Sequence, residues 1–350
     1  MTAPYTIISF ISDFKQMKWQ QASNGDLAFR KLSRDTTLFT LLMMPLLGRY
    51  DAVIFRYLND SHNIAGILRR LLVETLICAV AKSRGVDVIW FAHNVDREST
   101  VRYPSLNTLR RKMIGRFTNR VLVTDVSLIP EARKLLPVAA ATPILACTFG
   151  HMEIRIEKPV KGRPDADIDS VPEGKSFYVA SVNNWTDKKR PEFDLLLSLS
   201  RKALADNLDD CFIIAGPQTI KIRDTDPALY EQLKSIPNIC LLEGEVQLKQ
   251  LVDAGKCHAI VKSYTDMSLS LTLFQACSLG LAIISEQGTF MGAFIENNNV
   301  GVSIDPDSID IAQTQATCLE IIKDSSNFTR FFSHYSWERG AAVLCGKNPA

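Results

Sequence analysis

Short apolar runs alternate with helix-length segments along most of this chain. Asp51–Tyr57, Val86–Phe91 and Cys211–Ala215 are short apolar runs, whereas Ile64–Ser83 and Phe193–Ala205 have the length and pattern of helices. Continuous apolar runs are typical of strands buried on both faces of a parallel sheet. Strands that alternate with helices indicate βαβ units. The alternation therefore predicts an α/β fold built on parallel sheets.

The length and one polar stretch predict two domains. A chain of 350 residues can form two domains of ordinary size. Glu157–Gly174 is polar, rich in Pro and Gly and without an apolar period, which is typical of a linker. We therefore predict two Rossmann-like domains, over residues 1–155 and 156–330, that face each other across a cleft. A final helix over 331–350 is expected to cross back to the first domain.

The first expected strand, Tyr5–Ile11, is followed by a stretch that we interpret as a polar loop. Ser12–Asp26 contains no GxGxxG, so the dinucleotide fingerprint is missing. Thr6–Ile11 is too short for the apolar part of a signal peptide, and no run reaches the roughly 18 apolar residues of a membrane span. The eight cysteines include no CxxC pair, so they indicate buried free thiols in a reducing compartment. We expect a cytoplasmic protein.

The small net charge of +2 conceals an asymmetry along the chain. Residues 1–150 contain 20 Lys and Arg against 11 Asp and Glu, a net +9, which leaves −7 for the remainder. A basic half favours an anionic partner such as a membrane surface or a phosphorylated lipid. Nucleic acid is the competing interpretation, but no basic motif interleaved with aromatic residues supports it, and we expect no nucleic-acid partner.

Two segments of the basic half have two possible interpretations each. Thr37–Leu47 is unusually apolar and contains Pro45, so it is either a packed helix or a face that docks on a membrane. Leu106–Phe117 carries four basic residues, which form either a solvated helix face or an attachment to anionic lipid.

The stretch Ser263–Ser285 combines a polar loop, an apolar helix over about Leu269–Leu279, the stop signal Gly280 and a short apolar strand. A helix that begins beside a polar loop directs its N–H groups and positive dipole end at that loop, which favours phosphate. The alternative is an ordinary βα unit with a solvated loop.

One strand end in the first half places polar side chains where ligands bind. His93 and Asn94 directly follow the expected strand Val86–Phe91. Ligands of open α/β sheets bind beyond the carboxyl ends of the strands. His93 is therefore a candidate site residue, and the alternative is a histidine that only caps its strand.

The run SLSLTLFQACSLGLAII resembles the donor-binding segment of GT-B glycosyltransferases. The chain is most similar to bacterial exopolysaccharide transferases of the xanthan β-mannosyltransferase type, which also have a strand that ends in His-Asn with a Glu a few residues later, here Glu98. Trp337 and Glu338 are similar to the Trp-Glu pair of the last GT-B helix. Many retaining members carry two glutamates eight positions apart, where this chain has Met267 and Gln275. Retention and inversion therefore both stay open.

The resemblance implies a nucleotide-sugar-dependent hexosyltransferase of bacterial polysaccharide biosynthesis. The second domain would bind a GDP- or UDP-linked sugar without a metal cofactor, and the first would bind a lipid-linked oligosaccharide at the inner face of the cell membrane. In an inverting enzyme Asp96 or Glu98 would deprotonate the acceptor. In a retaining enzyme His93 would contact the donor sugar. Asn94 is expected to bind the acceptor.

The residues expected at the donor site lie in the polar segments that follow the strands of the second domain. They would clamp the diphosphate, contact the nucleobase or border the sugar, and some have the alternative of being ordinary loop lysines or helix-capping serines. They are Lys188, Lys189, Arg190, Gly216, Glu243, Gly244, Glu245, Lys262, Tyr264, Ser268, Ser270 and Gln275.

Two other functions remain open from the sequence. The first is a GT-B nucleotide-sugar epimerase, which would release sugar without an acceptor. The second is an inactive partner protein that binds nucleotide or lipid, because the glutamate pair and a Gly-rich first loop are both missing.

Overall fold

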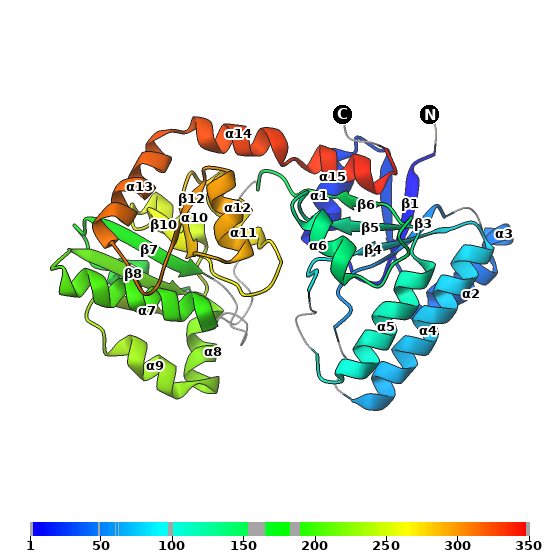
Figure 1. Ribbon diagram of the computed structural model, residues 1–350, viewed down its shortest axis with the longest axis horizontal. Coiled ribbons are helices and arrows are strands. Elements are labelled where there is room, and N and C mark those ends of the chain that lie inside the picture. Colours follow the sequence, from blue (N-terminus) through cyan, green and yellow to red (C-terminus); the bar gives the residue numbers. More distant parts are fainter. Residues whose placement is uncertain are drawn as a thin grey trace. The chain divides into compact units, whose positions relative to one another are not determined.

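The computed structural model describes residues 3–47, 50–59, 61, 63–96, 101–152, 165–182 and 190–347. The chain forms two compact units, which are coloured along the sequence in Figure 1. The first unit contains Met1–Gly150, Asp266–Leu269 and Tyr335–Ala350, and the second contains His151–Thr265 and Ser270–His334. Each unit is built on its own parallel sheet, so the predicted α/β class with two Rossmann-like units is confirmed.

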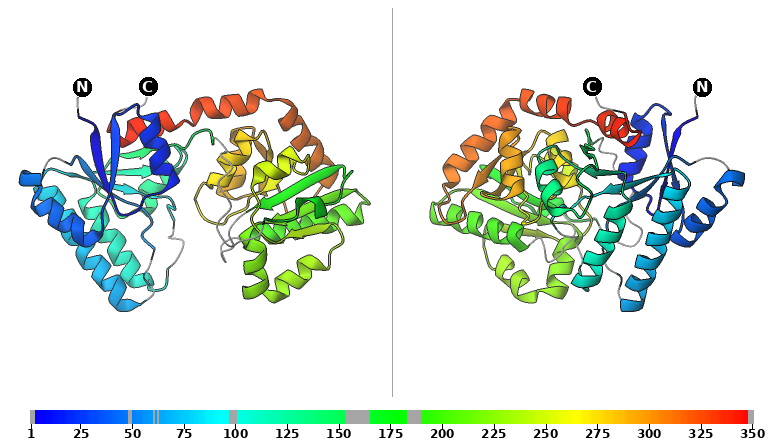
Figure 2. Two further views of the ribbon diagram at one scale, coloured as in Figure 1. Left: turned by 180° about the vertical axis from the view of Figure 1, so that it is seen from behind. Right: turned by 45° about the vertical axis from the view of Figure 1, so that its right-hand side comes forward.

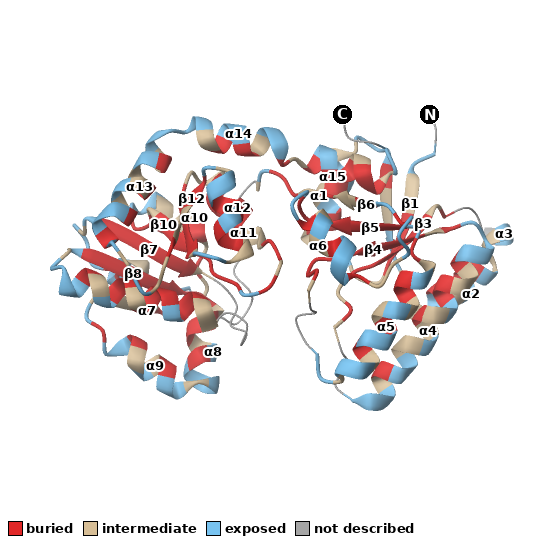
Figure 3. Cartoon of the chain, viewed as in Figure 1, coloured by how far each residue is buried: buried red, intermediate tan, exposed pale blue. Residues whose placement is uncertain are grey.

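The first unit has a six-stranded sheet in the order β2-β1-β3-β4-β5-β6. Every neighbouring pair is parallel, and Ile7 of β1, the second strand in this order, pairs with Phe29 on one side and Ala52 on the other. The strand interiors are buried, as Figure 3 shows. The strands are β1 (Tyr5–Ser9), β2 (Leu27–Lys31), β3 (Ala52–Phe55), β4 (Asp87–Phe91), β5 (Arg120–Val123) and β6 (Ile144–Ala146).

Helices cover both faces of this sheet. Along one face α2 packs on α4, which packs on α5, and on the other face α1 packs on the last helix of the chain (Figures 1 and 2). The helices are α1 (Phe14–Ala22), α2 (Arg34–Leu42), α3 (Met44–Leu47), α4 (Ile64–Ser83), α5 (Pro104–Phe117), α6 (Leu128–Leu135) and α15 (Trp337–Leu344).

The prediction of a polar loop over Ser12–Asp26 was wrong, because this segment contains α1. Asp13 caps the helix by accepting a hydrogen bond from the Gln16 amide at 3.1 Å. The buried face of α1 consists of Lys15, Gln16 and Trp19. Because two of these three buried residues are polar, the sequence of α1 does not show the apolar period from which a helix is recognised.

The second unit repeats the architecture with the strand order β12-β11-β10-β7-β8-β9, again entirely parallel. Its strands are β7 (Phe177–Val182), β8 (Asp210–Ala215), β9 (Ile239–Leu242), β10 (Ala259–Val261), β11 (Ala282–Glu286) and β12 (Gly301–Ile304). Its helices are the short η1 (Ile168–Ser170), then α7 (Arg190–Ala205), α8 (Pro217–Thr225), α9 (Pro227–Lys234), α10 (Leu248–Asp253), α11 (Leu271–Ser278), α12 (Phe290–Asn297), α13 (Ile311–Lys323) and α14 (Ser326–His334).

The final helix α15 is part of the first unit. Ser336 caps it by accepting from the Arg339 amide, and the Ser336 carbonyl accepts from Thr148 Oγ1 at 2.9 Å. Trp337 lies edge-on to Trp19 with ring centroids 5.8 Å apart. The expected helix over residues 331–350 is therefore interrupted before Trp337, where α14 ends and α15 begins. Among the helices that the structure describes, none has the length and apolar character needed to cross a membrane.

Candidate functional site

Because the strands of the first sheet are parallel, the segments that follow β1, β3 and β4 meet at one edge. Arg56, which follows β3, is buried there and connects Asp13 with His93. Its Nε donates to His93 Nε2 at 3.2 Å, and its Nη1 donates to Asp13 Oδ1 at 3.0 Å. Its Nη2 lies 2.9 Å from Asp13 Oδ2, an ion-pair contact whose geometry does not make a second hydrogen bond. Since Nε2 of His93 accepts a hydrogen bond, the ring proton of the neutral imidazole belongs on Nδ1.

His93 is stacked between two aromatic rings. The ring centroids of Tyr57 and Phe91 lie 4.5 Å and 4.2 Å from the imidazole centroid. His93 is only 8% exposed, and burial, with further contributions from the charges of Lys15 and Arg56, lowers its pKa well below the usual value. The side chain is therefore neutral at physiological pH and offers Nδ1–H as a donor.

Lys15 of α1 contributes a second unusual cation to this edge. Its Nζ donates to the Tyr57 hydroxyl at 2.9 Å and lies 4.7 Å from the centroid of Phe149. Burial and the nearby Arg56 charge lower the pKa of Lys15 to about 7. Tyr57 has a φ of 39°, in the left-handed region that a bulky residue rarely adopts. Strained backbone and shifted pKa values both gather at functional sites.

Sequence reasoning identified only His93 in this group. Arg56 and Tyr57 directly follow a recognised strand, so the strand-end rule that found His93 also applies to them. Asp13 and Lys15 were hidden because α1 was interpreted as a loop.

The segment after β4 contacts a loop from a distant part of the chain. The Met267 amide donates to Asp96 Oδ1 at 3.2 Å, and the Val95 amide donates to the Met267 carbonyl. In the same loop Ser268 Oγ donates to Asp266 Oδ1 at 2.6 Å. Asp96 and Ser268, expected at the catalytic and donor sites, thus lie together within the first unit. Asn94 is buried beside His93, and Glu98 lies outside the described residues.

In the second unit, Lys262 follows β10 and is completely buried. Its Nζ lies 3.1 Å and 3.3 Å from the two carboxylate oxygens of Glu192 on α7. Ser181 Oγ donates to Glu192 Oε1 at 2.6 Å. Burial lowers the pKa of Lys262, and the Glu192 charge acts in the opposite direction. The Lys262 ammonium, which we expected to contact the donor, thus forms a fully buried ion pair with the Glu192 carboxylate.

Two glycines and a glutamine shape the carboxyl edge of the second sheet. Gly216 after β8 and Gly244 after β9 have φ values of 92° and 121°, which glycine adopts without strain. Gln218, at the start of α8, donates through Nε2 to the carbonyls of Ser181 and Ala215. Its buried Oε1 has no hydrogen-bond partner in the described part of the chain. Sequence reasoning did not identify Gln218, because a glutamine after Gly-Pro carries no recognisable signal.

Several expected donor residues have structural contacts of their own. Glu243 accepts from Arg223 and Tyr230, and the Glu245 carbonyl accepts from the Ala166 amide. Arg190 Nη1 pairs with Asp226 Oδ2 at 2.9 Å.

The remaining expected donor residues lie in or near α11, with two exceptions. Ser270 Oγ caps α11 by accepting from the Thr272 amide at 3.2 Å. Tyr264 is buried and Gln275 is half-buried on α11. Lys188 and Lys189 lie outside the described residues. Within the described ranges, no group of three or more His, Cys, Asp or Glu side chains could hold a metal ion.

Neither a family model nor a curated protein matches this sequence, but solved structures match it along almost its entire length. A glycosyltransferase from Rickettsia africae is 11% identical, with 99% of this chain and 98% of that chain covered and a TM-score of 0.61. HepE from Anabaena, in complex with UDP, is 10% identical, with 98% of each chain covered and a TM-score of 0.61.

A protein from Listeria monocytogenes described as a UDP-N-acetylglucosamine 2-epimerase is 8% identical, with 98% of this chain and 95% of that chain covered and a TM-score of 0.53. Identities this low establish likeness of fold and not of activity. The chain therefore has the two-unit α/β fold known as GT-B, as its sequence resemblance predicted.

Proposed function

We propose that this protein is a glycosyltransferase that moves a sugar from a nucleotide-diphospho-sugar to a saccharide acceptor. The observation that carries the proposal is the buried cluster of Asp13, Lys15, Arg56 and His93 at the carboxyl edge of the first sheet. Burying several ionisable groups together is expensive and seldom stabilises a fold by itself. In a GT-B fold, this is the edge at which a substrate would bind.

The donor is proposed to bind at the carboxyl edge of the second sheet. Gly216 and Gly244 would let backbone approach the nucleotide closely. Arg190, with Lys188 and Lys189, would stabilise the negative charge that develops on the leaving diphosphate. UDP is the preferred nucleotide in this proposal because HepE binds it, and GDP remains the alternative.

In the first unit, neutral His93 is proposed to orient a substrate hydroxyl through its Nδ1–H. Asp96 is the proposed base that removes the proton from the acceptor if the reaction inverts, with Glu98 as the alternative. Asn94, buried beside His93, is proposed to bind the acceptor. Arg56 would keep the imidazole in the required tautomer by donating to Nε2.

The acceptor is proposed to be lipid-linked and to be used at an anionic membrane surface during exopolysaccharide assembly. The support is an apolar stripe on α4, formed by Ile64, Leu68, Leu72 and Leu76, which recur every four residues and are 42–62% exposed. Contiguous exposed apolar residues are a feature of interaction sites. Together with the +9 charge of residues 1–150, it suits a helix that lies in a membrane interface.

The test is nucleotide binding followed by turnover. Thermal unfolding is measured with UDP, GDP, ADP, CMP and dTDP, since a ligand at about 100 times its Kd stabilises by about 2.7 kcal/mol. We expect one nucleotide to raise the Tm. Replacing Lys188, Lys189 and Arg190 with Ala should abolish that shift, whereas the matched surface variant Lys202→Ala/Lys221→Ala/Lys249→Ala should retain it.

Incubation with the corresponding nucleotide-sugar then separates the rival functions. A transferase needs an acceptor for rapid nucleotide release, and His93→Ala should lower kcat by about a hundredfold or more. Sugar release that is equally fast without an acceptor would instead identify an epimerase. Nucleotide binding without turnover would identify an inactive partner protein. If none of the nucleotides raises the Tm, the result would contradict the transferase function.

A further inference from the structure

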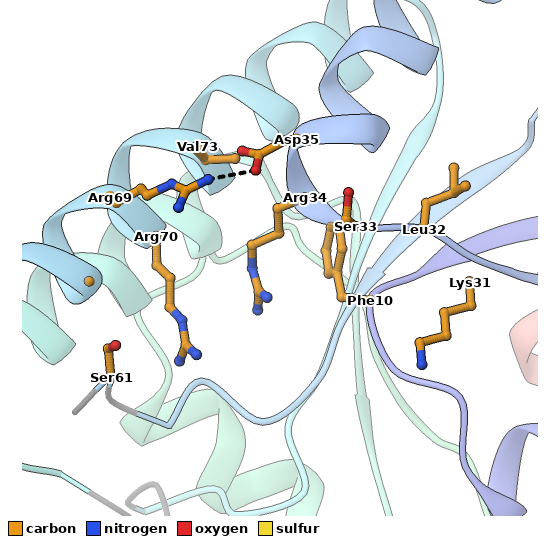
Figure 4. A pocket seen from close by; sticks show the side chains of 11 residues that line it. Phe10, Lys31, Leu32, Ser33, Arg34, Asp35, Ser61, Arg69, Arg70 and Val73 are labelled. Atoms are coloured by element: carbon orange, nitrogen blue, oxygen red, sulfur yellow. Dashed lines mark hydrogen bonds and ion pairs between the residues drawn. The ribbon is translucent and has the colours of Figure 1, made fainter. Parts of the chain in front are cut away.

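A cavity of about 630 Å³ opens in the first unit beside the carboxyl ends of β1 and β2 (Figure 4). Phe10 follows β1 and Leu32 follows β2, while Ser61 precedes α4 and Gly66 lies in its first turn. The remaining lining residues belong to the end of β2, the first turn of α2 and the first turns of α4. They are Lys31, Ser33, Arg34, Asp35, Arg69, Arg70 and Val73.

The charges around this cavity are strongly unbalanced. Lys31, Arg34, Arg69 and Arg70 are cationic, and Asp35 is the one acidic residue among those that line the cavity. Asp35 pairs with Arg69 at 2.6 Å, in a solvent-exposed contact that contributes little stability. Three positive charges remain in excess. Figure 4 shows the side chains of Arg34 and Arg70, both of which line the cavity, extended in the same direction.

A buried network beneath the cavity holds these arginines in place. Glu74 accepts from Arg34 Nε at 2.7 Å and from Arg110 Nε and Nη2 at 2.5 Å and 2.8 Å. One carboxylate thus serves two guanidinium groups, so it does not neutralise both. Arg110 and Arg70 also donate to the Asn59 carbonyl. Arg34 contacts Glu74 through its Nε and packs its guanidinium over the Phe10 ring, and its side chain is 29% exposed.

Two helices strengthen the positive field at this place. The first turn of α2 contributes Ser33, Arg34 and Asp35 to the lining, and the start of α4 contributes Gly66. The N-terminus of a helix carries a partial positive charge and favours anions. Planar guanidinium groups match the geometry of phosphate oxygens in two-pronged hydrogen bonds.

We propose that this cavity binds a phosphate or diphosphate group of the acceptor, an inference that rests on the proposed transferase function. The cavity and the His93 cluster lie along the same edge of one sheet. Neighbouring strands are about 4.8 Å apart, and β2 is three strand positions from β4. The carboxyl end of β2, beside the cavity, therefore lies roughly 14 Å along the edge from the carboxyl end of β4, which precedes His93. An acceptor that extends along this edge could hold its phosphate in the cavity and reach the cluster with a hydroxyl.

The test uses the full-length protein and inorganic pyrophosphate. The cavity variant is Lys31→Gln/Arg69→Gln/Arg70→Gln, which leaves the buried Arg34–Glu74–Arg110 network intact. The matched control, Lys82→Gln/Lys112→Gln/Arg116→Gln, removes the same charge from exposed positions of α4 and α5. Calorimetric titration should give a Kd for the cavity variant that is about tenfold or more weaker than for the native protein, as expected for lost charge-assisted hydrogen bonds. The control should match the native protein.

The same titrations with and without saturating UDP separate this inference from the proposed function. Pyrophosphate binding that UDP does not displace, and that only the cavity variant weakens, supports the cavity. Equal weakening in both variants, or none in either, overturns the inference, even if UDP binds as proposed. If only the cavity variant weakens pyrophosphate binding but the protein binds no nucleotide, the result would support the anion site and contradict the transferase function.

A second arm identifies the source of the phosphate. Phosphatidylcholine vesicles with and without phosphatidic acid are sedimented with each protein. Greater loss of binding in the cavity variant than in the control, with competition by pyrophosphate, supports a phosphate carried by a lipid. Binding of pyrophosphate but not of the vesicles supports the same site with a soluble phosphorylated acceptor.

Discussion

At the scale of single residues, Lys15 makes stability depend on pH in a characteristic way. Its pKa is lowered from 10.5 to about 7 in the folded protein, mainly by burial. Between these two values the unfolded chain binds a proton that the folded protein does not, so stability rises with pH across this window. At pH below 7, Lys15 is protonated in both states, and burying its charge lowers the free energy of unfolding by on the order of 5 kcal/mol.

Lys15→Met should therefore increase stability relative to the native protein most at pH 6, and this difference should disappear toward pH 10.5. Urea unfolding followed by tryptophan fluorescence is suited to the measurement, because Trp19, Trp90 and Trp337 all belong to the first unit. The exposed Lys31→Met variant should show no such dependence. A difference that stays constant from pH 6 to 10 would contradict the lowered pKa.

Lys262 illustrates what single residues do not reveal in a sequence. It follows a strand, as a ligand-binding lysine would, but its partner Glu192 lies 70 positions earlier on α7. A buried pair becomes recognisable only when the sheet has brought β10 next to β7. The strand-end rule located this residue in the chain but not the direction of its side chain.

At the scale of secondary structure elements, α4 has two different sides. Its buried residues include Ile67, Glu74 and Ile77, whereas Leu68 and Leu72 are 47% and 62% exposed. Leu68→Ser/Leu72→Ser should weaken sedimentation with vesicles that contain anionic lipid by about tenfold or more, because partial burial of a leucine contributes on the order of 1 kcal/mol or more. The fold should be unaffected, since both side chains are exposed.

The matched control for this prediction is Val126→Ser/Leu204→Ser, which alters exposed apolar residues away from α4. Equal binding by both double variants would show that the stripe on α4 does not contact the membrane.

Elements with an apolar period were predictable, and those without one were not. Ile64–Ser83 was predicted with the bounds of α4, and the expected strand Val86–Phe91 differs from β4 by one residue at its start. Helix α1 escaped prediction because Lys15 and Gln16 lie on its buried face. Asp13 and Lys15 of the candidate site were hidden for the same reason, because buried polar residues interrupt the apolar period from which a helix is recognised. Arg56 and Tyr57 follow a strand that was recognised, but their role depends on contacts with distant segments.

At the scale of the whole molecule, the first unit is completed by the last residues of the chain. Gly340 on α15 is tightly packed: a Cβ at this position would lie 2.4 Å from the Thr148 carbonyl oxygen and 2.5 Å from Trp19 Nε1. Gly340→Val should therefore loosen α15 and destabilise the first unit by several kcal/mol.

Hydrogen exchange measures this effect separately in each unit. Protection of β1 and β4 should fall, while protection of β7 and β8 should remain, because those strands belong to the other unit. The half-buried Ala342→Val on the same helix is the control. Equal loss of protection in both units would mean that they unfold together.

The placement of α15 also has a consequence for how the protein is made. A ribosome synthesises the six strands of the first sheet long before Tyr335–Ala350, which belong to the same unit. Domains are usually expected to fold in the order of their synthesis. Here the unit that is begun first is finished last, after translation of the second unit is complete. A nascent chain thus carries its candidate catalytic edge, with Trp19 and Phe149 not yet in contact with Trp337, until the ribosome has synthesised α15 and the chain has left its exit tunnel.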